Sequence, residues 1–116
     1  MPKFILLLHE GPNAFPADIS PDQIQAIIRR YVEWRKKVQQ NGRTVEGHKL
    51  TDGEGRVMRA AAGSARVTDG PYAEAREVIG GLFIVDAQNY EEVVELSKDC
   101  PHLDFGTIEI REVQPT

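Results

Sequence analysis

One short segment, Asp69-Gly70-Pro71, constrains the fold of this chain more than any other part of the sequence. Glycine enters backbone conformations closed to other residues, while proline fixes φ and removes a backbone donor, so the segment requires one defined loop shape. The pair Gly80-Gly81 then opens an apolar strand. Because paired glycines permit close approach of a backbone or a ligand, we expect both pairs, Gly70-Pro71 and Gly80-Gly81, to border a ligand-binding site.

Length and composition indicate a single domain spanning residues 1–116, with 41% hydrophobic and 28% charged residues, as in soluble globular proteins. Fourteen basic against eighteen acidic residues give a net charge of -4, which argues against nucleic acid as a partner. The apolar run at residues 4–8 is too short to span a membrane. Because Cys100 is the one cysteine and no signal-peptide pattern is present, we expect a cytoplasmic protein.

Hydrophobic periodicity and capping residues predict the order of the secondary-structure elements. One helix begins after Ser20, which combines an N-cap hydroxyl with Pro21 in the first turn and Gln23 at the capping-box position. A second helix begins after Asn89, with Glu92 completing a capping box, and ends before a proline. The predicted strands span residues 4–8, 43–50, 56–61, 65–68, 80–86 and 107–113. The unbroken apolar run of the first of these predicts a core strand, either covered on both faces or central in the sheet.

This order is the split βαβ plan of the ferredoxin-like fold, with a β-hairpin inserted in its middle. We therefore predict an α+β protein whose helices cover one face of an antiparallel sheet. The first helix is suited to cover a sheet, because its apolar side chains recur at helical spacing and so form one apolar face. They are Ile24, Ile27, Ile28, Tyr31, Trp34 and Val38. The other face of the sheet needs cover, and the simplest cover is the same face of a second subunit, which predicts a homodimer.

Several motifs together resemble one protein family. They are residues 67–74, the Gly80-Gly81 pair, Cys100-Pro101-His102 and residues 106–111. This set is similar to the YCII-related family, in its DGPF subgroup, over nearly the whole chain, although Tyr72 stands where the subgroup has phenylalanine. The resemblance implies a dimeric α+β barrel, related in architecture to small cofactor-free isomerases and monooxygenases. It also implies a His and Asp acid/base pair in an intersubunit cleft, as proposed for shorter relatives, and a link to sigma factors, beside which similar domains occur.

Asp69 is the first candidate for a catalytic residue. At the end of a strand, it is placed to act as a general acid or base in a cleft. An Asp before Gly and Pro also caps turn amides, so both roles stay open. Tyr72 and Glu74 are ligand-binding candidates: the tyrosine shapes the pocket and the glutamate offers a second carboxylate, although acids in such a charged segment more often form a solvated face.

The three histidines are further candidates, because histidine titrates near neutral pH. His9 follows the first strand and is the preferred catalytic histidine, whereas His48 is either ligand-binding or packed inside the second strand, and His102 precedes the last strand. Their spacing matches no metal motif, and no glycine-rich phosphate loop opens a helix, so we expect neither a metal nor a cofactor. Cys100 lies close to His102, yet a cysteine before proline at a helix end is more often buried than nucleophilic.

Two classes of function follow from these residues. The first is a cofactor-free enzyme that transfers a proton on a small organic molecule, using Asp69 and a histidine, with Tyr72 shaping the pocket. The second is a non-catalytic dimer that binds a small ligand or a protein partner, with a link to transcription regulation through sigma-factor neighbours. The role of Asp69, acid/base group or turn cap, distinguishes the two.

Overall fold

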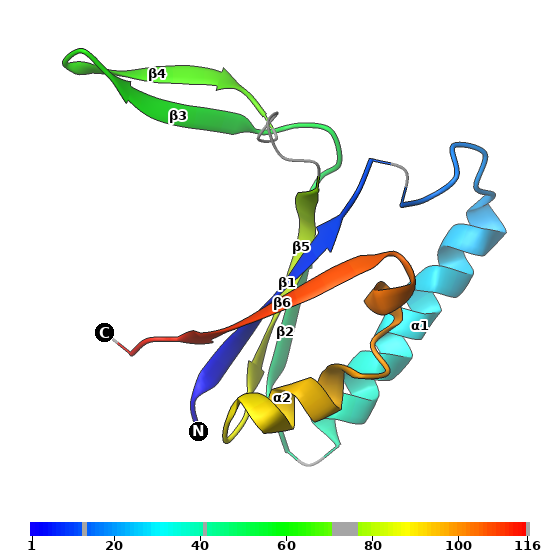
Figure 1. Ribbon diagram of the computed structural model, residues 1–116. Coiled ribbons are helices and arrows are strands. Elements are labelled where there is room, and N and C mark those ends of the chain that lie inside the picture. The colour runs from blue at the N-terminus through cyan, green and yellow to red at the C-terminus, as the bar shows by residue number, and fades with distance from the viewer. Residues whose placement is uncertain (13, 41, 71–76, 116) are drawn as a thin grey trace.

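The main sheet has four strands, each antiparallel to its neighbours, in the order β2-β5-β1-β6 (Figure 1). This computed structural model describes residues 1–12, 14–40, 42–70 and 77–115. The strands of the main sheet are β1 (Lys3–Glu10), β2 (Val45–Lys49), β5 (Val78–Asp86) and β6 (Gly106–Val113). β1 contains the apolar run of the sequence, and its place between β5 and β6 confirms the prediction of a central strand.

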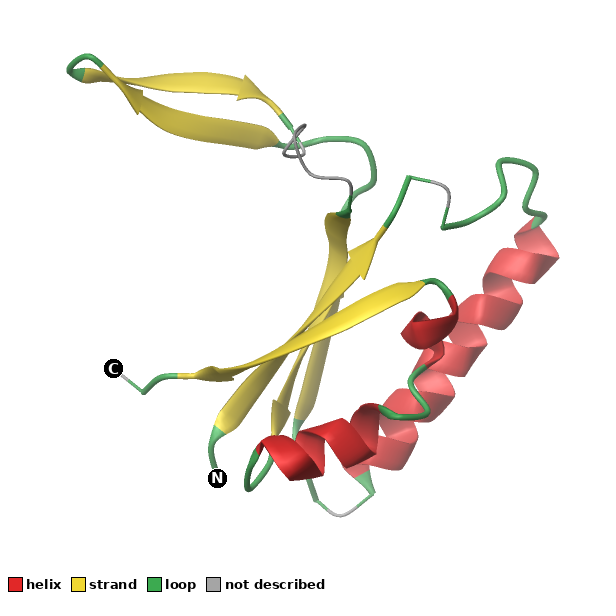
Figure 2. Cartoon of the chain, viewed as in Figure 1, coloured by secondary structure: helices red, strands yellow, loops and turns green. Residues whose placement is uncertain are grey.

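The helices lie together on one face of the main sheet (Figure 2). They are α1 (Pro21–Gln39), α2 (Tyr90–Ser97) and the short 3-10 helix η1 (Pro101–Asp104). Among the described residues, no helix is long and apolar enough to cross a membrane.

The two predicted helix starts differ in their caps. Ser20 forms the complete capping box: its hydroxyl accepts from the Gln23 amide at 3.1 Å, and the Gln23 side chain accepts from the Ser20 amide at 2.8 Å. At α2, Asn89 accepts from the Glu92 amide at 2.9 Å, but the Glu92 carboxylate binds Arg43 at 2.6 Å. The predicted capping box at Asn89 is therefore wrong in its second bond, because the carboxylate makes a charge-assisted bond instead.

The remaining strands, β3 (Arg56–Ala61) and β4 (Ser64–Asp69), form a second sheet of two strands. This hairpin is inserted between β2 and β5, and it projects from one end of the main sheet toward the side away from the helices (Figure 1). We call residues 56–69 the arm. The strand order, the helices on one face and the inserted hairpin confirm the predicted ferredoxin-like α+β fold.

The hydrophobic core lies between the main sheet and the C-terminal half of α1. Along β1, Phe4, Leu6 and Leu8 are buried and alternate with less buried residues, because successive side chains of a strand point to opposite faces. Trp34 and Val38 of α1 pack against them. These contacts hold the last turns of α1 on the sheet.

The N-terminal half of α1 is packed differently. Ile24 and Ile28 belong to the predicted apolar face, but they remain 41% and 46% exposed. The apolar face of α1 is therefore part of the core in one half of the helix and the wall of an open cavity in the other.

The second face of the main sheet is not covered by any helix of the described chain. Ile5 and Leu7 of β1 point to this side, as do their cross-strand partners Ile84 and Leu82 of β5, and all four are partly exposed. We call this surface the open face.

Candidate functional site

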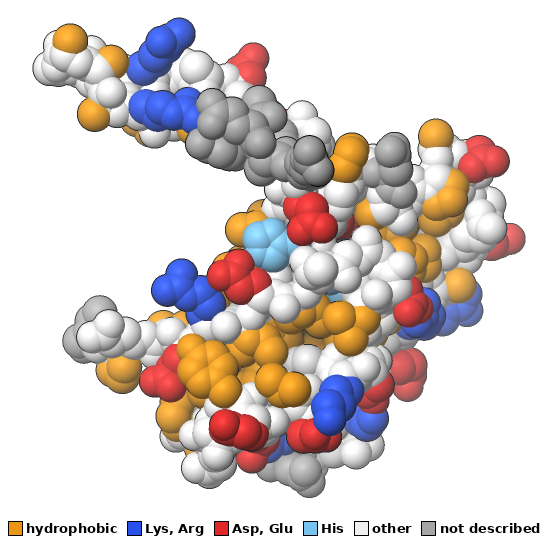
Figure 3. Space-filling model, in the orientation of Figure 1, with side chains coloured by type: hydrophobic (Ala, Val, Ile, Leu, Met, Phe, Trp, Pro, Cys, Tyr) orange, Lys and Arg blue, Asp and Glu red, His pale blue; other side chains and the backbone are white. Residues whose placement is uncertain are grey.

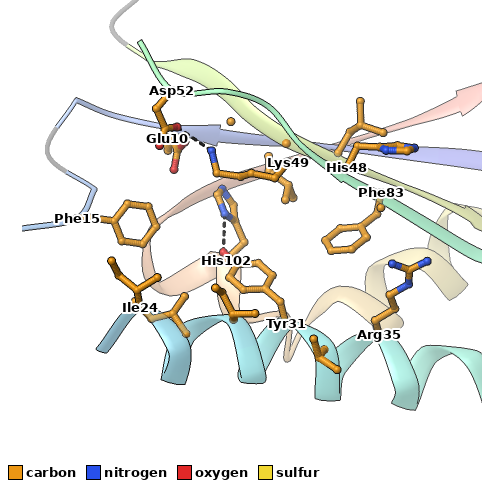
Figure 4. Close-up of a pocket in the computed structure, with 18 of the residues that line it drawn as sticks. Glu10, Phe15, Ile24, Tyr31, Arg35, His48, Lys49, Asp52, Phe83 and His102 are labelled. Atoms are coloured by element: carbon orange, nitrogen blue, oxygen red, sulfur yellow. Dashed lines mark hydrogen bonds and ion pairs between the residues drawn. The ribbon is translucent and has the colours of Figure 1, made fainter. Parts of the chain in front are cut away.

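A cavity of about 560 Å³ lies between the N-terminal half of α1 and the main sheet (Figure 4). Its volume falls within the range of small-molecule pockets in proteins. Apolar side chains make up most of its lining, among them Phe15, Ile19, Ile24, Ile27, Ile28 and Phe83.

Three glycines in β2 and β5 explain why the space under α1 is not filled. Gly47, Gly80 and Gly81 all border the cavity. A Cβ atom on Gly47 would lie 2.6 Å from the Phe83 ring, and one on Gly81 would lie 2.9 Å from the His48 carbonyl oxygen. Because neither position has room for a side chain, the strands present backbone to the cavity and leave it hollow.

Gly80 lies at a β-bulge between β1 and β5. Leu8 pairs with Gly81 and His9 pairs with Ile79, so Gly80 is the additional residue. A Cβ atom on Gly80 would overlap the Glu10 carboxylate. The glycine and the bulge together make room for that carboxylate.

Glu10 is the one acidic side chain that β1 places inside the cavity. Strand alternation puts it on the same side as Leu8, and the residue is only 9% exposed. Within the described ranges, its carboxylate has no hydrogen-bond or ion-pair partner. Because no fully buried side-chain nitrogen or oxygen of the described residues lacks a hydrogen-bond partner, this carboxylate is not sealed off but remains open to the cavity. A polar group that faces an otherwise apolar cavity is a candidate for binding or acting on a ligand.

Tyr31 and His102 form a hydrogen-bonded pair beside Glu10. His102 Nε2 lies 2.8 Å from the His9 carbonyl oxygen, which only accepts, so Nε2 carries the proton and Nδ1 is the acceptor. The Tyr31 hydroxyl, 3.1 Å from Nδ1, therefore donates to His102 (Figure 4). Burial, followed by the negative charges of nearby groups, raises the pKa of Tyr31 well above its usual value. The phenol stays protonated and keeps its oxygen lone pairs available to a ligand.

Charged side chains occur where the cavity meets solvent. Lys49 donates to Asp52 at 2.7 Å, and both side chains are exposed (Figure 4). Arg35 borders the cavity at another point and donates to the Val45 carbonyl at 2.9 Å. The lining is thus apolar inside, with ionic groups near the solvent.

The predicted catalytic residues lie outside this cavity. Asp69 is at the end of β4, with its side chain 93% exposed and its carboxylate 3.6 Å from Arg56. His9 points to the open face, where its Nε2 lies 2.9 Å from the Glu109 carboxylate. The structure of one subunit therefore does not bring Asp69 and His9 together at the cavity, and their catalytic role stays a prediction.

The predicted ligand-binding residues are divided between the cavity and other places. Gly80 and Gly81 border the cavity, whereas Gly70 lies at the base of the arm and donates its amide to the Gly55 carbonyl at 2.8 Å. His48 contributes backbone to the lining, but its imidazole points away and lies 2.9 Å from Glu46 (Figure 4). Pro71, Tyr72 and Glu74 lie outside the described residues.

Cys100 belongs to the hydrophobic core. The residue is 3% exposed, and burial raises the pKa of its thiol to about 11. This agrees with the buried alternative and leaves little thiolate for a nucleophile at neutral pH. Among the residues that the structure describes, no group of three His, Cys, Asp or Glu side chains is arranged to hold a metal ion.

Sequence reasoning did not select Glu10 or Tyr31 as residues of a site, and it counted His102 among the three candidate histidines without assigning it a role. Period-two alternation from Leu6 and Leu8 extends to Glu10, and this signal is present in the sequence. No local signal joins Tyr31 to His102, because the two residues are 71 positions apart.

Comparison with known proteins agrees with the observed fold. An uncharacterized protein of Rhizobium meliloti (strain 1021) is 30% identical to the chain over 57 residues, which cover 47% of this chain and 46% of that relative. The aligned part is thus about half the length of each protein. The profile of the YCII-related domain matches residues 3–116. Because that match covers almost the whole chain, the protein belongs to the YCII-related family.

Proposed function

We propose that the cavity binds a small, mostly apolar organic molecule, and that Glu10 transfers a proton to or from it without a cofactor. The observation that carries this proposal is the Glu10 carboxylate, which faces an apolar cavity of about 560 Å³ and has no hydrogen-bond or ion-pair partner among the described residues. A carboxylate held in such surroundings acts as a general base when a bound molecule places an acidic proton within reach.

The lining favours a neutral ligand with a weakly acidic proton, such as a carbon acid next to a carbonyl group. The apolar wall of α1 takes up the hydrocarbon part, and Glu10 accepts the proton. Negative charge then develops on the carbonyl oxygen, and the Lys49 ammonium near the solvent end supports that charge. If the molecule is a β,γ-unsaturated ketone, return of the proton to the γ-carbon moves the double bond into conjugation with the carbonyl group, and no atom is gained or lost in this isomerisation.

Solvent-deuterium incorporation tests this reaction directly. A neutral cyclic β,γ-unsaturated ketone serves as the probe in deuterated buffer, and NMR follows the loss of the signal of the C–H between its carbonyl group and its double bond. We expect wild-type protein to speed the exchange and Glu10→Gln to remove at least about nine tenths of this acceleration, since the amide is no base. Glu95→Gln is the matched control, because Glu95 is an exposed carboxylate on α2 that pairs with Lys98 and lies away from both the cavity and the open face.

Binding is measured separately, by amide chemical-shift changes at Gly47, Gly80 and Gly81. Shifts at these cavity residues without any Glu10-dependent exchange would refute catalysis and support the alternative of a ligand-binding module. Equal exchange rates for the Glu10→Gln and Glu95→Gln variants would also refute the role of Glu10.

A homodimer that pairs two open faces is the second part of the proposal. The open face is apolar at its centre and carries both charge signs around it: Lys3 and Arg111 are basic, and Glu46 and Glu109 are acidic. Such a surface is self-complementary across a two-fold axis.

The predicted acid/base pair of Asp69 and His9 is retained only in this dimer, where the two residues come from different subunits. Asp69→Asn should then change ligand binding without dissociating the dimer.

A further inference from the structure

The arm extends the molecule beyond the size of a compact monomer. The Cα radius of gyration is 16.4 Å, whereas a compact chain of this length has a value of about 13 Å. In the described part of the chain, β3 and β4 pair only with each other. An isolated two-stranded hairpin is at best marginally stable in water. The arm is therefore expected to gain stability from a surface outside its own subunit.

One face of the arm is apolar and fully available to such a surface. The cross-strand pairs Met58–Val67 and Ala60–Ala65 lie on this face. Met58 is 66% exposed and Val67 is 54% exposed. Large apolar side chains placed opposite each other in water are typical of a protein contact surface.

The other face of the arm is basic. Arg59 and Arg66 lie directly opposite each other on this face. Residues 56–69 contain three arginines and one aspartate, a net charge of +2. Since the whole chain carries -4, the rest of the chain carries -6. The rest of a second copy of this chain therefore carries a net charge opposite to that of the arm.

The position of the arm fits a second copy. It projects toward the side of the main sheet that the helices leave uncovered (Figure 1). The space-filling view shows a deep hollow between the arm and the rest of the molecule (Figure 3). A subunit that packs on the open face would lie beneath the arm. The arm and the open face thus form two sides of one concave surface.

We propose that the arm of each subunit clasps a second copy of this chain, with the face of Met58 and Val67 packed on the partner. The inference rests on the homodimer proposed above, and it adds that the arm holds the two subunits together. Each arm would cover part of its partner, so both copies contribute and receive the same contact.

Substitutions in the arm test this contact by sedimentation equilibrium. We expect Met58→Glu and Val67→Glu each to raise the dimer dissociation constant at least about tenfold, because a charge would be buried in an apolar contact. Far-UV circular dichroism should stay unchanged, since the arm is not part of the core. Leu103→Glu is the control: Leu103 is 49% exposed on η1, on the helical side, and its variant should dimerise like wild type.

A cross-link identifies the partner of the arm. Met58 is replaced by the photoreactive residue p-benzoylphenylalanine, and ¹⁴N-labelled and ¹⁵N-labelled proteins are mixed before irradiation. Mixed-isotope cross-links to a second copy would support the clasp. Cross-links within one subunit only, or wild-type dimerisation by both glutamate variants, would overturn the clasp while leaving the open-face dimer intact. A monomeric wild type would overturn the clasp and the dimer, whereas the Glu10-dependent exchange is judged independently.

Discussion

Replacing Tyr31 by phenylalanine isolates the hydrogen bond between α1 and η1. The change removes one oxygen atom and leaves His102 Nδ1 without its donor. Because His102 is 3% exposed, water is a poor substitute for that donor. A buried acceptor left unsatisfied costs about 1–3 kcal/mol of unfolding free energy. For a domain of this size, that corresponds to a fall in melting temperature of roughly 4–12 °C.

Urea denaturation measures this free energy, with Trp34 fluorescence as the signal. Trp34 is the single tryptophan of the chain and is buried in the core, so its emission reports loss of the packing between α1 and the sheet. Tyr90→Phe provides the matched control. The Tyr90 hydroxyl accepts from the Glu112 amide at 2.8 Å, but Tyr90 is half exposed, so water replaces the lost acceptor. We expect this variant to lose less than about 0.5 kcal/mol.

The reasoning would be refuted by equal losses in the two variants, or by a Tyr31→Phe protein as stable as wild type. Either result would mean that the bond to His102 contributes no more than an exposed hydrogen bond.

Two further predictions concern pH and the floor of the cavity. Burial raises the pKa of Tyr31, so an unfolded chain releases the phenol proton near pH 10, as ordinary tyrosine does, while the folded chain retains it. The resulting stability is fully present below about pH 10 and is lost as the pH rises further, and urea midpoints above that pH should fall more steeply for wild type than for Tyr31→Phe. Gly80→Ala should displace the Glu10 carboxylate and lower the Glu10-dependent deuterium exchange about tenfold, because the added Cβ overlaps that group. Gly11→Ala, whose Cβ would meet nothing within 4 Å, should keep the wild-type rate, and equal losses in both variants would contradict the assigned role of Gly80.

The elements of the fold could be predicted because their signals are local. The capping residues around Ser20 lie within one turn of the helix, and Gly63 turns the hairpin with a positive φ of 85°. The apolar run of β1 identified a central strand by itself. The second bond at Asn89 could not be predicted, because Arg43, distant in sequence, binds the Glu92 carboxylate.

The cavity was less accessible to sequence reasoning, since it depends on which face each residue occupies. His9 was preferred because it ends the first strand, but alternation along β1 turns it to the open face and turns Glu10 into the cavity. The apolar face of α1 was identified correctly, whereas the gap beneath its first half results from glycines in two other strands. The glycine pair 80–81 was expected to permit close approach, and the approaching groups are the Glu10 carboxylate and the His48 backbone.

The bulge at Gly80 has a consequence for chain length. The pairs on either side of it, Leu8–Gly81 and His9–Ile79, are already consecutive along β1. Deletion of Gly80 would therefore leave all the remaining residue pairs between β1 and β5 in register. The deletion would remove the backbone hydrogen bond that the Leu50 amide donates to the Gly80 carbonyl at 2.9 Å. It would also close the space in which the Glu10 carboxylate lies. A one-residue deletion would therefore keep the pairing of the strands while removing the space around Glu10, so the length of β5 controls the shape of the cavity independently of the fold.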